Sequence, residues 1–257
     1  MENSGNAGER YLDAAKALLT DLWESQSQGI ERAAAWIAET LQRDSLIFVA
    51  GSGHSHMLAE ELFYRAGGLA AVVPLLESSL MLHDGAVKSS GVERLEGYAA
   101  VVIEDAGVGA DDLLIIASNS GRNAYPVELA LEARARGCRT IAVTSLATAE
   151  RVESRHSSGG KLARVADLVL DNRVAYGDAT IDVIGLPSRV GPLSTIAGVA
   201  LLNAAVVRAI ELCVEQGYLP DVFESANLQE AGGAAGRPDE VAAGLDLFRW
   251  RRRVRRL

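Results

Sequence analysis

Short apolar runs alternate with longer amphipathic segments along most of the chain. These runs, rich in Val, Ile, Leu and Ala, occupy residues 46–50, 70–76, 113–117, 140–145 and 168–171. Runs of this length, bounded by polar or turn residues, are typical of strands that are buried on both faces of a parallel sheet. The alternation with helical segments predicts right-handed βαβ units. We therefore expect an α/β fold, a three-layer αβα sandwich around a five-stranded parallel sheet.

The first 42 residues show apolar positions at helical spacing. The polar stretch Ser25 to Gly29 interrupts this pattern and predicts a break between two helices, which would pack on the sheet or on a partner. Further helices are predicted at residues 56–64, 92–102, 126–133, 147–155 and 194–216. The segment 77–85 is polar and irregular, as is typical of a functional loop.

The chain divides into three parts that differ in sequence pattern and composition. We expect N-terminal helices at residues 1–43, the sandwich at 44–218, and a C-terminal loop with a basic tail at 219–257. Ala231 to Gly236 has the composition of a linker, and Arg249 to Arg256 that of a basic, solvated terminus.

Composition narrows the class of protein. The chain has 257 residues, of which 49% are hydrophobic and 23% charged, enough to bury the core of one α/β domain. A formal net charge of -9 disfavours nucleic acids and anionic membranes as main partners. The longest apolar stretch, residues 196–210, contains Asn203 and Arg208 and predicts a buried helix, while the N-terminus lacks the pattern of a signal peptide. Cys138 and Cys213 are too few for a disulfide framework, so we expect a cytoplasmic protein.

Two strand-to-helix turns are rich in Ser and Gly. Gly51-Ser52-Gly53-His54-Ser55 follows the first predicted strand, and Ser118-Asn119-Ser120-Gly121-Arg122-Asn123 follows the third. The carboxyl ends of strands in one parallel sheet face a common crevice, where free N–H groups and helix N-termini favour an anion such as phosphate. The alternative is that these residues only cap helices and turn the chain.

The motifs Gly-x-Gly-x-Ser at Gly51 to Ser55 and Ser-x-Ser-Gly at Ser118 to Gly121 resemble those of the sugar isomerase (SIS) domain family of phosphosugar-binding proteins. The similarity spans roughly residues 30–215 and implies a flavodoxin-like sheet. It also implies that the substrate phosphate is bound by Ser52, Ser55, Ser118, Asn119, Ser120 and Asn123. The related pattern usually has Thr where this chain has Asn123.

Glu61 lies on the helix that follows the first turn, where SIS enzymes often place the catalytic base. The alternative is an ordinary ion pair with Arg65, four residues later. Service as a base requires that the two are not tightly paired, because a nearby guanidinium opposes a raised carboxylate pKa. Glu60, about 100° away around the helix, is the natural comparison.

Three further residues are candidates for proton transfer. His83 and His156 lie in polar loops after strands, where a histidine can serve as a proton shuttle. Glu224 is a further candidate if no carboxylate on the helix serves.

We expect neither a metal nor another cofactor. Zinc-using heptose-phosphate isomerases of this superfamily carry His at the position of Glu61 and Glu at that of Arg65, and this chain has neither. His54 and His56 lack a convincing third ligand nearby in the sequence.

A narrower resemblance rests on Ser118 to Asn123, Ser154 to Gly159 and Tyr176 to Ala179. These segments are similar to the actinobacterial N-acetylglucosamine-6-phosphate dehydratase group, relatives of the N-acetylmuramic acid 6-phosphate etherases. The resemblance implies a carbon–oxygen lyase that removes the carbon-2 proton of a phosphorylated amino sugar and expels the carbon-3 hydroxyl.

Aldose–ketose isomerisation shares the first of these steps, so a phosphosugar isomerase remains the nearest alternative. A non-catalytic phosphosugar-binding regulator is a third, although the N-terminal stretch shows no basic recognition helix. We expect a homodimer, with His83 or His156 as candidates to reach the partner's crevice.

Overall fold

The computed structural model describes residues 5–224, built around five parallel strands in the order β2-β1-β3-β4-β5. In chain order the elements, of which those marked η are 3-10 helices, are α1 (Ala7–Gln42), β1 (Ile47–Gly51), η1 (Gly53–His56), α2 (Met57–Leu62), β2 (Val72–Leu75), η2 (Ser78–Leu80), η3 (Leu82–Asp84), α3 (Ala86–Val92), α4 (Tyr98–Ala106), β3 (Leu113–Ala117), α5 (Ala124–Ala135), β4 (Arg139–Thr144), α6 (Leu146–Arg151), α7 (Leu162–Val165), β5 (Leu168–Asp171), β6 (Ala179–Ile181), β7 (Val190–Pro192) and α8 (Ser194–Glu215). The predicted α/β fold with a five-stranded parallel sheet is confirmed.

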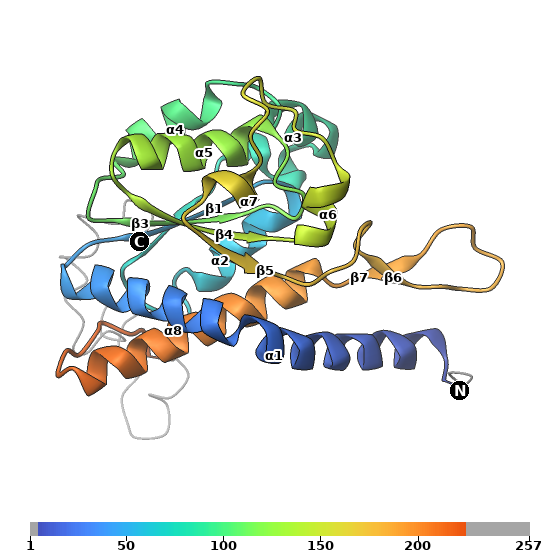
Figure 1. Cartoon of the computed structure of the whole chain (residues 1–257), viewed down its shortest axis with the longest axis horizontal. Helices are drawn as coiled ribbons and strands as arrows, with labels where there is room; N and C mark the ends of the chain where they lie inside the picture. Colours follow the sequence, from blue (N-terminus) through green and yellow to red (C-terminus); the bar gives the residue numbers. More distant parts are fainter. Residues whose placement is uncertain (1–4, 225–257) are drawn as a thin grey trace, which may run out of the picture.

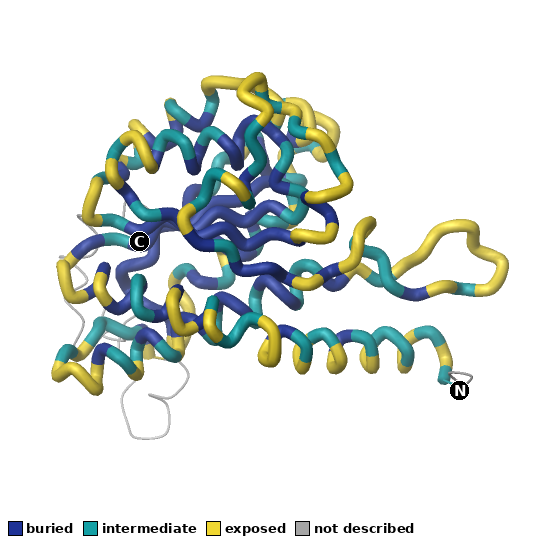
Figure 2. Tube along the Cα trace, viewed as in Figure 1, coloured by how far each residue is buried: buried dark blue, intermediate teal, exposed yellow. Residues whose placement is uncertain are grey.

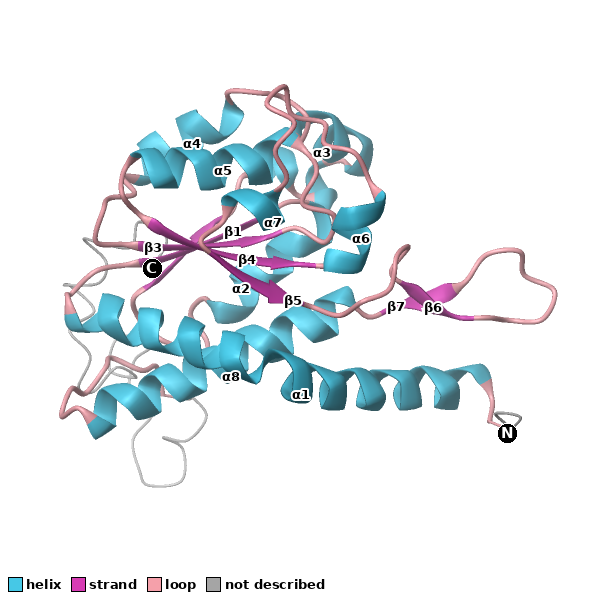
Figure 3. Cartoon of the chain, viewed as in Figure 1, coloured by secondary structure: helices cyan, strands magenta, loops and turns pink. Residues whose placement is uncertain are grey.

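Helices cover both faces of the sheet (Figures 1 and 3). Helices α1, α2 and α8 lie on one face, and α4, α5 and α7 on the other. All residues of β1 and β3 are consequently buried (Figure 2), which explains why these strands are apolar runs without alternation.

Helix α1 is continuous from Ala7 to Gln42, so the predicted break at Ser25 to Gly29 is wrong. The polar and small residues of this stretch are used in packing. The Gln26 side chain accepts a hydrogen bond from the Asp171 backbone N–H at 3.0 Å. A Cβ on Gly29 would lie 3.1 Å from a methyl group of Leu170, so Gly29 allows α1 to approach β5 closely.

A hairpin of β6 and β7, which the pattern did not predict, lies beside the N-terminal half of α1 (Figure 1). Tyr11 Oη donates to the Pro192 carbonyl at 2.9 Å, and Arg10 Nη2 to the Asp182 carbonyl at 2.8 Å. Together the two elements form an arm that extends away from the sandwich (Figure 1).

Some predicted helices are shorter or divided. Helix α2 ends at Leu62 rather than residue 64, because Phe63 is extended and Tyr64 has a left-handed φ of 42°. The helix predicted at 92–102 is replaced by the end of α3, a turn, and α4, which begins after Gly97 at φ 85°. The helix predicted at 147–155 ends at Arg151, and a loop follows.

Among the described residues, α8 alone is long and apolar enough, by length and composition, to cross a membrane. Its most apolar window is 44% buried, and the helix packs along α1 and α2, as expected of an internal helix of this fold. The three-part division of the chain stays a prediction, and the linker and basic tail lie outside the described residues.

Candidate functional site

The two Ser/Gly turns leave adjacent strands at the same level. Gly51, the last residue of β1, is in register with Ala117, the last residue of β3. The chain turns sharply after β1, because a Cβ on Gly51 would lie 2.4 Å from the Ser55 carbonyl oxygen and 2.8 Å from the His56 nitrogen. The sheet therefore places the two turns side by side, as the sequence predicted.

A pocket opens between these turns and the start of α8. It is lined by His54, Ser55, Leu58, Ala117, Asn119, Val143, Asn172, Ser194 and Thr195. Two predicted phosphate-binding residues, Ser55 and Asn119, are among them. His54 belongs to the first turn, whereas Asn172, Ser194 and Thr195 were not predicted for the site, because they follow β5 or begin α8, far away in the sequence.

Internal hydrogen bonds shape the second turn. Ser118 Oγ accepts from the Gly121 N–H at 3.2 Å, and Gly121 has a left-handed φ of 57°. Asn172 Nδ2 donates to Asn119 Oδ1 at 2.9 Å, which connects the turn to the end of β5. Ser120 is half-buried, and its hydroxyl has no partner among the described residues, so it can bind a ligand without breaking an existing bond.

A carboxylate that sequence reasoning missed connects the two turns. Ser52 Oγ donates to Glu93 Oε1 at 2.6 Å, and Asn123 Nδ2 donates to Glu93 Oε2 at 2.7 Å. Two predicted phosphate ligands are thus already hydrogen-bonded to a carboxylate. No sequence signal marked Glu93, which follows α3 and was expected inside a helix.

Arg155 completes this network from the loop after α6. Its Nη1 donates to Asn123 Oδ1 at 3.1 Å. Burial, followed by repulsion from Arg122 and Arg94, lowers the pKa of Arg155. The charge of these guanidinium groups is offset in part by the nearby Glu93 carboxylate.

Asp178 caps the start of α8. Its Oδ1 accepts from the Leu193 and Ser194 N–H groups at 3.0 and 2.9 Å, and its Oδ2 accepts from Ser194 Oγ at 2.6 Å. The Tyr176 to Ala179 motif thereby contributes a residue that fixes the first turn of the helix lining the pocket. The positive end of the α8 dipole faces the same pocket.

Glu61 is paired with Arg65 and accepts from Asn203 Nδ2 at 3.0 Å. The requirement that Glu61 and Arg65 remain unpaired is therefore not met, and the i,i+4 ion pair is the arrangement observed. Glu61 does not line the pocket between the turns. Arg65 and Asn203 line a different cavity, between α2 and α8.

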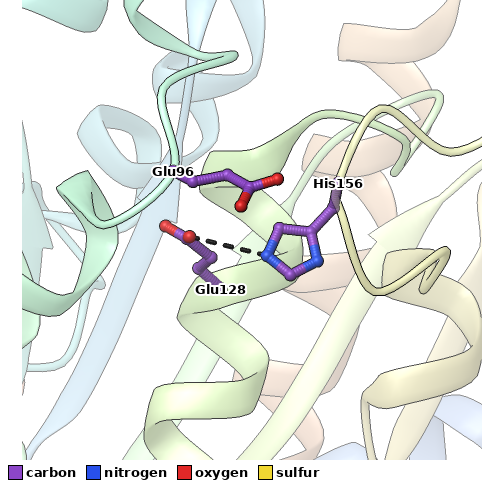
Figure 4. Close-up of side chains that lie close together, drawn as sticks. All are labelled: Glu96, Glu128 and His156. Carbon is purple, nitrogen blue, oxygen red and sulfur yellow. Dashed lines mark ion pairs between the residues drawn. The ribbon is translucent and has the colours of Figure 1, made fainter.

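His156 lies in a cluster with Glu96 and Glu128, outside the pocket (Figure 4). Its Nε2 is 3.5 Å from Glu128 Oε1, and its Nδ1 is 2.7 Å from Ser158 Oγ. Hydrogen bonds from Ser157 to Glu96 hold the pKa of that carboxyl below its ordinary value.

The ligand atoms of this cluster lie within 4.8 Å of one another, a spacing that a metal ion would accept. In both carboxylates, however, both oxygens already accept hydrogen bonds. Glu128 accepts from the Gly97 N–H at 2.7 and 2.9 Å, and Glu96 accepts from Ser157 N and Oγ at 2.6 and 2.8 Å. These bonds fasten the loop after α6, which carries Arg155, to α5 and to the turn before α4.

The remaining predicted catalytic residues also lie away from the pocket lining. His83 is exposed, and its ring centroid is 6.1 Å from that of buried His56. Glu224 is exposed and follows the segment whose Val222 bridges Leu69. Their catalytic roles stay predictions.

Comparison with known proteins identifies the family. The SIS domain profile matches residues 10–145. A UPF0309 protein of Listeria monocytogenes is 38% identical over 86% of this chain and 90% of the relative. A UPF0309 protein of Halalkalibacterium halodurans is 42% identical over 86% and 91%.

Solved structures share the fold at low sequence identity. A phosphoheptose isomerase from Francisella tularensis has a TM-score of 0.52 at 15% identity, covering 78% of this chain and 95% of that one. The Vibrio vulnificus NanR protein complexed with ManNAc-6P has a TM-score of 0.51 at 18% identity, covering 83% and 66%. The family resemblance drawn from the two Ser/Gly turns is confirmed, whereas the narrower dehydratase group stays a prediction. This chain belongs to the SIS domain family and, within it, to the UPF0309 proteins.

Proposed function

We propose that this protein is a phosphosugar lyase that dehydrates N-acetylglucosamine 6-phosphate. The observation that carries the proposal is the pocket between the two Ser/Gly turns, which combines available hydroxyl groups with the N-terminus of α8. Such a combination favours a phosphate group, because N–H groups and a positive dipole end converge there. The solved NanR complex with ManNAc-6P is consistent with a phosphorylated amino sugar as the ligand.

The reaction begins with removal of the carbon-2 proton from the open-chain aldehyde. In a dehydratase, the hydroxyl on carbon 3 then leaves as water. An isomerase instead returns a proton to carbon 1, and the similarity to phosphoheptose isomerases makes this the second candidate. No cofactor is needed for either route.

The decisive experiment is incubation of the purified protein with N-acetylglucosamine 6-phosphate, followed by mass spectrometry. A product lighter by one water molecule supports the lyase. A product of unchanged mass but ketose structure indicates the isomerase, and binding without conversion indicates a regulator. Absence of both binding and conversion refutes the proposal.

The phosphate-binding role of Ser120 has a test of its own. The Ser120 hydroxyl has no partner among the described residues, so removing it would break only a hydrogen bond to the ligand and none within the protein. A lost hydrogen bond to a charged group costs about 1.5–3 kcal/mol, so we expect Ser120→Ala to weaken binding by about tenfold or more in calorimetric titration. Ser90→Ala, on exposed α3, is the matched control; equal affinity in both variants would remove Ser120 from the site.

We also propose that the protein works as a homodimer. Leu12, Leu19 and Trp23 form a stripe on α1 and are 58%, 41% and 66% exposed, which favours a partner on this face. Sedimentation showing a monomer that is active at assay concentration would refute this. The two buried, free cysteines agree with the reducing cytoplasm as its location.

A further inference from the structure

The pocket between the two turns contains one side chain suited to proton transfer. Of the described residues that line it, His54 alone carries an ionisable side chain; the others carry hydroxyl, amide or apolar groups. No carboxylate from residues 5–224 lines the pocket, and Glu61, the predicted base, is held by Arg65 and Asn203 elsewhere. A reaction that moves a proton in this pocket therefore needs a different residue from the one expected.

The turn leaves the His54 side chain exposed and buries the side chain of His56. Gly53, the first residue of the 3-10 helix η1, adopts a left-handed φ of 56°, and η1 places His54 on the exposed side and His56 on the buried side. The His56 ring contacts the Gly53 carbonyl and lies 3.5 Å from Glu60 Oε1. The His54 ring, by contrast, has neither a hydrogen-bond nor an ion-pair partner among residues 5–224.

We propose that His54 is the catalytic residue that exchanges a proton with the sugar bound in this pocket, an inference that rests on the proposed lyase function. An unprotonated ring nitrogen of His54 takes the proton from carbon 2, and the electron pair of the C–H bond moves into the enolate. The resulting imidazolium gives that proton to the carbon-3 hydroxyl, which leaves as water while the enolate electrons form the carbon 2–carbon 3 double bond. His54 returns to its neutral state, and the balance requires no other reactant.

This assignment explains how one pocket can serve both halves of the elimination. Ser55, the next residue, lies on the same turn and also lines the pocket, so a phosphate bound there holds the sugar chain beside the imidazole. A histidine is suited to both steps because it takes up and releases protons near neutral pH.

The test compares His54→Asn with Glu60→Gln, which removes another ionisable group close to the same turn. With N-acetylglucosamine 6-phosphate, we expect His54→Asn to lower turnover by about two to four orders of magnitude, and Glu60→Gln to stay close to wild type. Added imidazole should restore part of the His54→Asn activity, because it can supply the missing proton-transfer group. Turnover within about threefold of wild type, or a fall that imidazole does not rescue, would overturn the proposal.

A second measurement separates this inference from the proposed function. If the wild type converts no N-acetylglucosamine 6-phosphate, the lyase proposal fails, but the placement of His54 can still be tested with inorganic phosphate. The chain has four histidines, so the ring signal that disappears in His54→Asn identifies His54 by nuclear magnetic resonance. At constant pH, inorganic phosphate should shift that signal; an unchanged His54 signal when phosphate binds would refute its place at the ligand.

Discussion

Gly51 is the position where a single methyl group should do most harm to the site. An added Cβ would lie 2.4 Å from the Ser55 carbonyl oxygen, 2.5 Å from the Ser55 carbonyl carbon and 2.8 Å from the His56 nitrogen. All three are backbone atoms of the turn, so no side-chain rotation relieves the contacts. The turn itself must move away from the end of β1.

We expect Gly51→Ala to cost about 3 kcal/mol, the upper part of the usual range for overpacking a buried site. For a chain of this size, that corresponds to a fall in Tm of about 6–12 °C. Displacement of Ser55 and His54, which line the pocket, should also abolish binding of inorganic phosphate and of N-acetylglucosamine 6-phosphate.

Thermal unfolding and calorimetric titration measure these two effects. Gly91→Ala is the matched control, because a Cβ there meets no atom within 4 Å and the residue lies in α3. The control should be neutral or more stable by up to about 1 kcal/mol. A Gly51→Ala protein with the Tm and the phosphate affinity of the wild type would show that the turn can move at a lower energetic cost than these contacts indicate.

Three further predictions concern stability. Asp178→Asn should lower the free energy of unfolding, measured by urea denaturation, by about 1 kcal/mol, because Asp178 caps α8. The control Asp182→Asn, at a side chain that is 77% exposed, should change this free energy little. Equal effects of the two substitutions would contradict the capping role. Tyr125→Phe should raise the free energy of unfolding by about 1–2 kcal/mol, because the buried Tyr125 hydroxyl has no hydrogen-bond partner among the described residues. A lower free energy of unfolding in this variant would show that the hydroxyl has a partner. Burial raises the pKa of the Cys138 thiol to about 12, so its contribution to stability is complete below the unfolded pKa of about 8.5 and is lost as pH rises toward 12. Between about pH 8 and pH 10, the free energy of unfolding measured with urea should fall less in Cys138→Ala than in the wild type. Equal falls in the two proteins would contradict this explanation.

The strands were predictable because burial on both faces leaves a simple signature. Each predicted strand agrees with the observed one to within about two residues, a normal uncertainty for element ends. The break in α1 was wrong because Gln26 and Gly29 look like a turn in sequence, whereas their actual role is contact with β5. Such a role depends on a neighbour that local pattern cannot reveal.

The site was predictable only where its residues follow a strand directly. Ser55 and Asn119 were found in this way, and both line the pocket. Glu93, Asn172 and Thr195 reach the site through tertiary packing, and no local motif marks them. For Glu61, spacing alone was compatible with both the base and the ion pair, and the structure shows the ion pair.

The carboxylate of Glu93 makes the two turns energetically dependent on one another. Ser52 and Asn123 are 71 residues apart in the sequence, yet both donate to the same side chain. Removing either donor leaves Glu93 with a single partner, so the cost of losing the second depends on whether the first is still present. The effects of substitutions at Ser52 and Asn123 should therefore fail to add in a double-mutant cycle, so a change in one turn alters how the other turn responds to substitution.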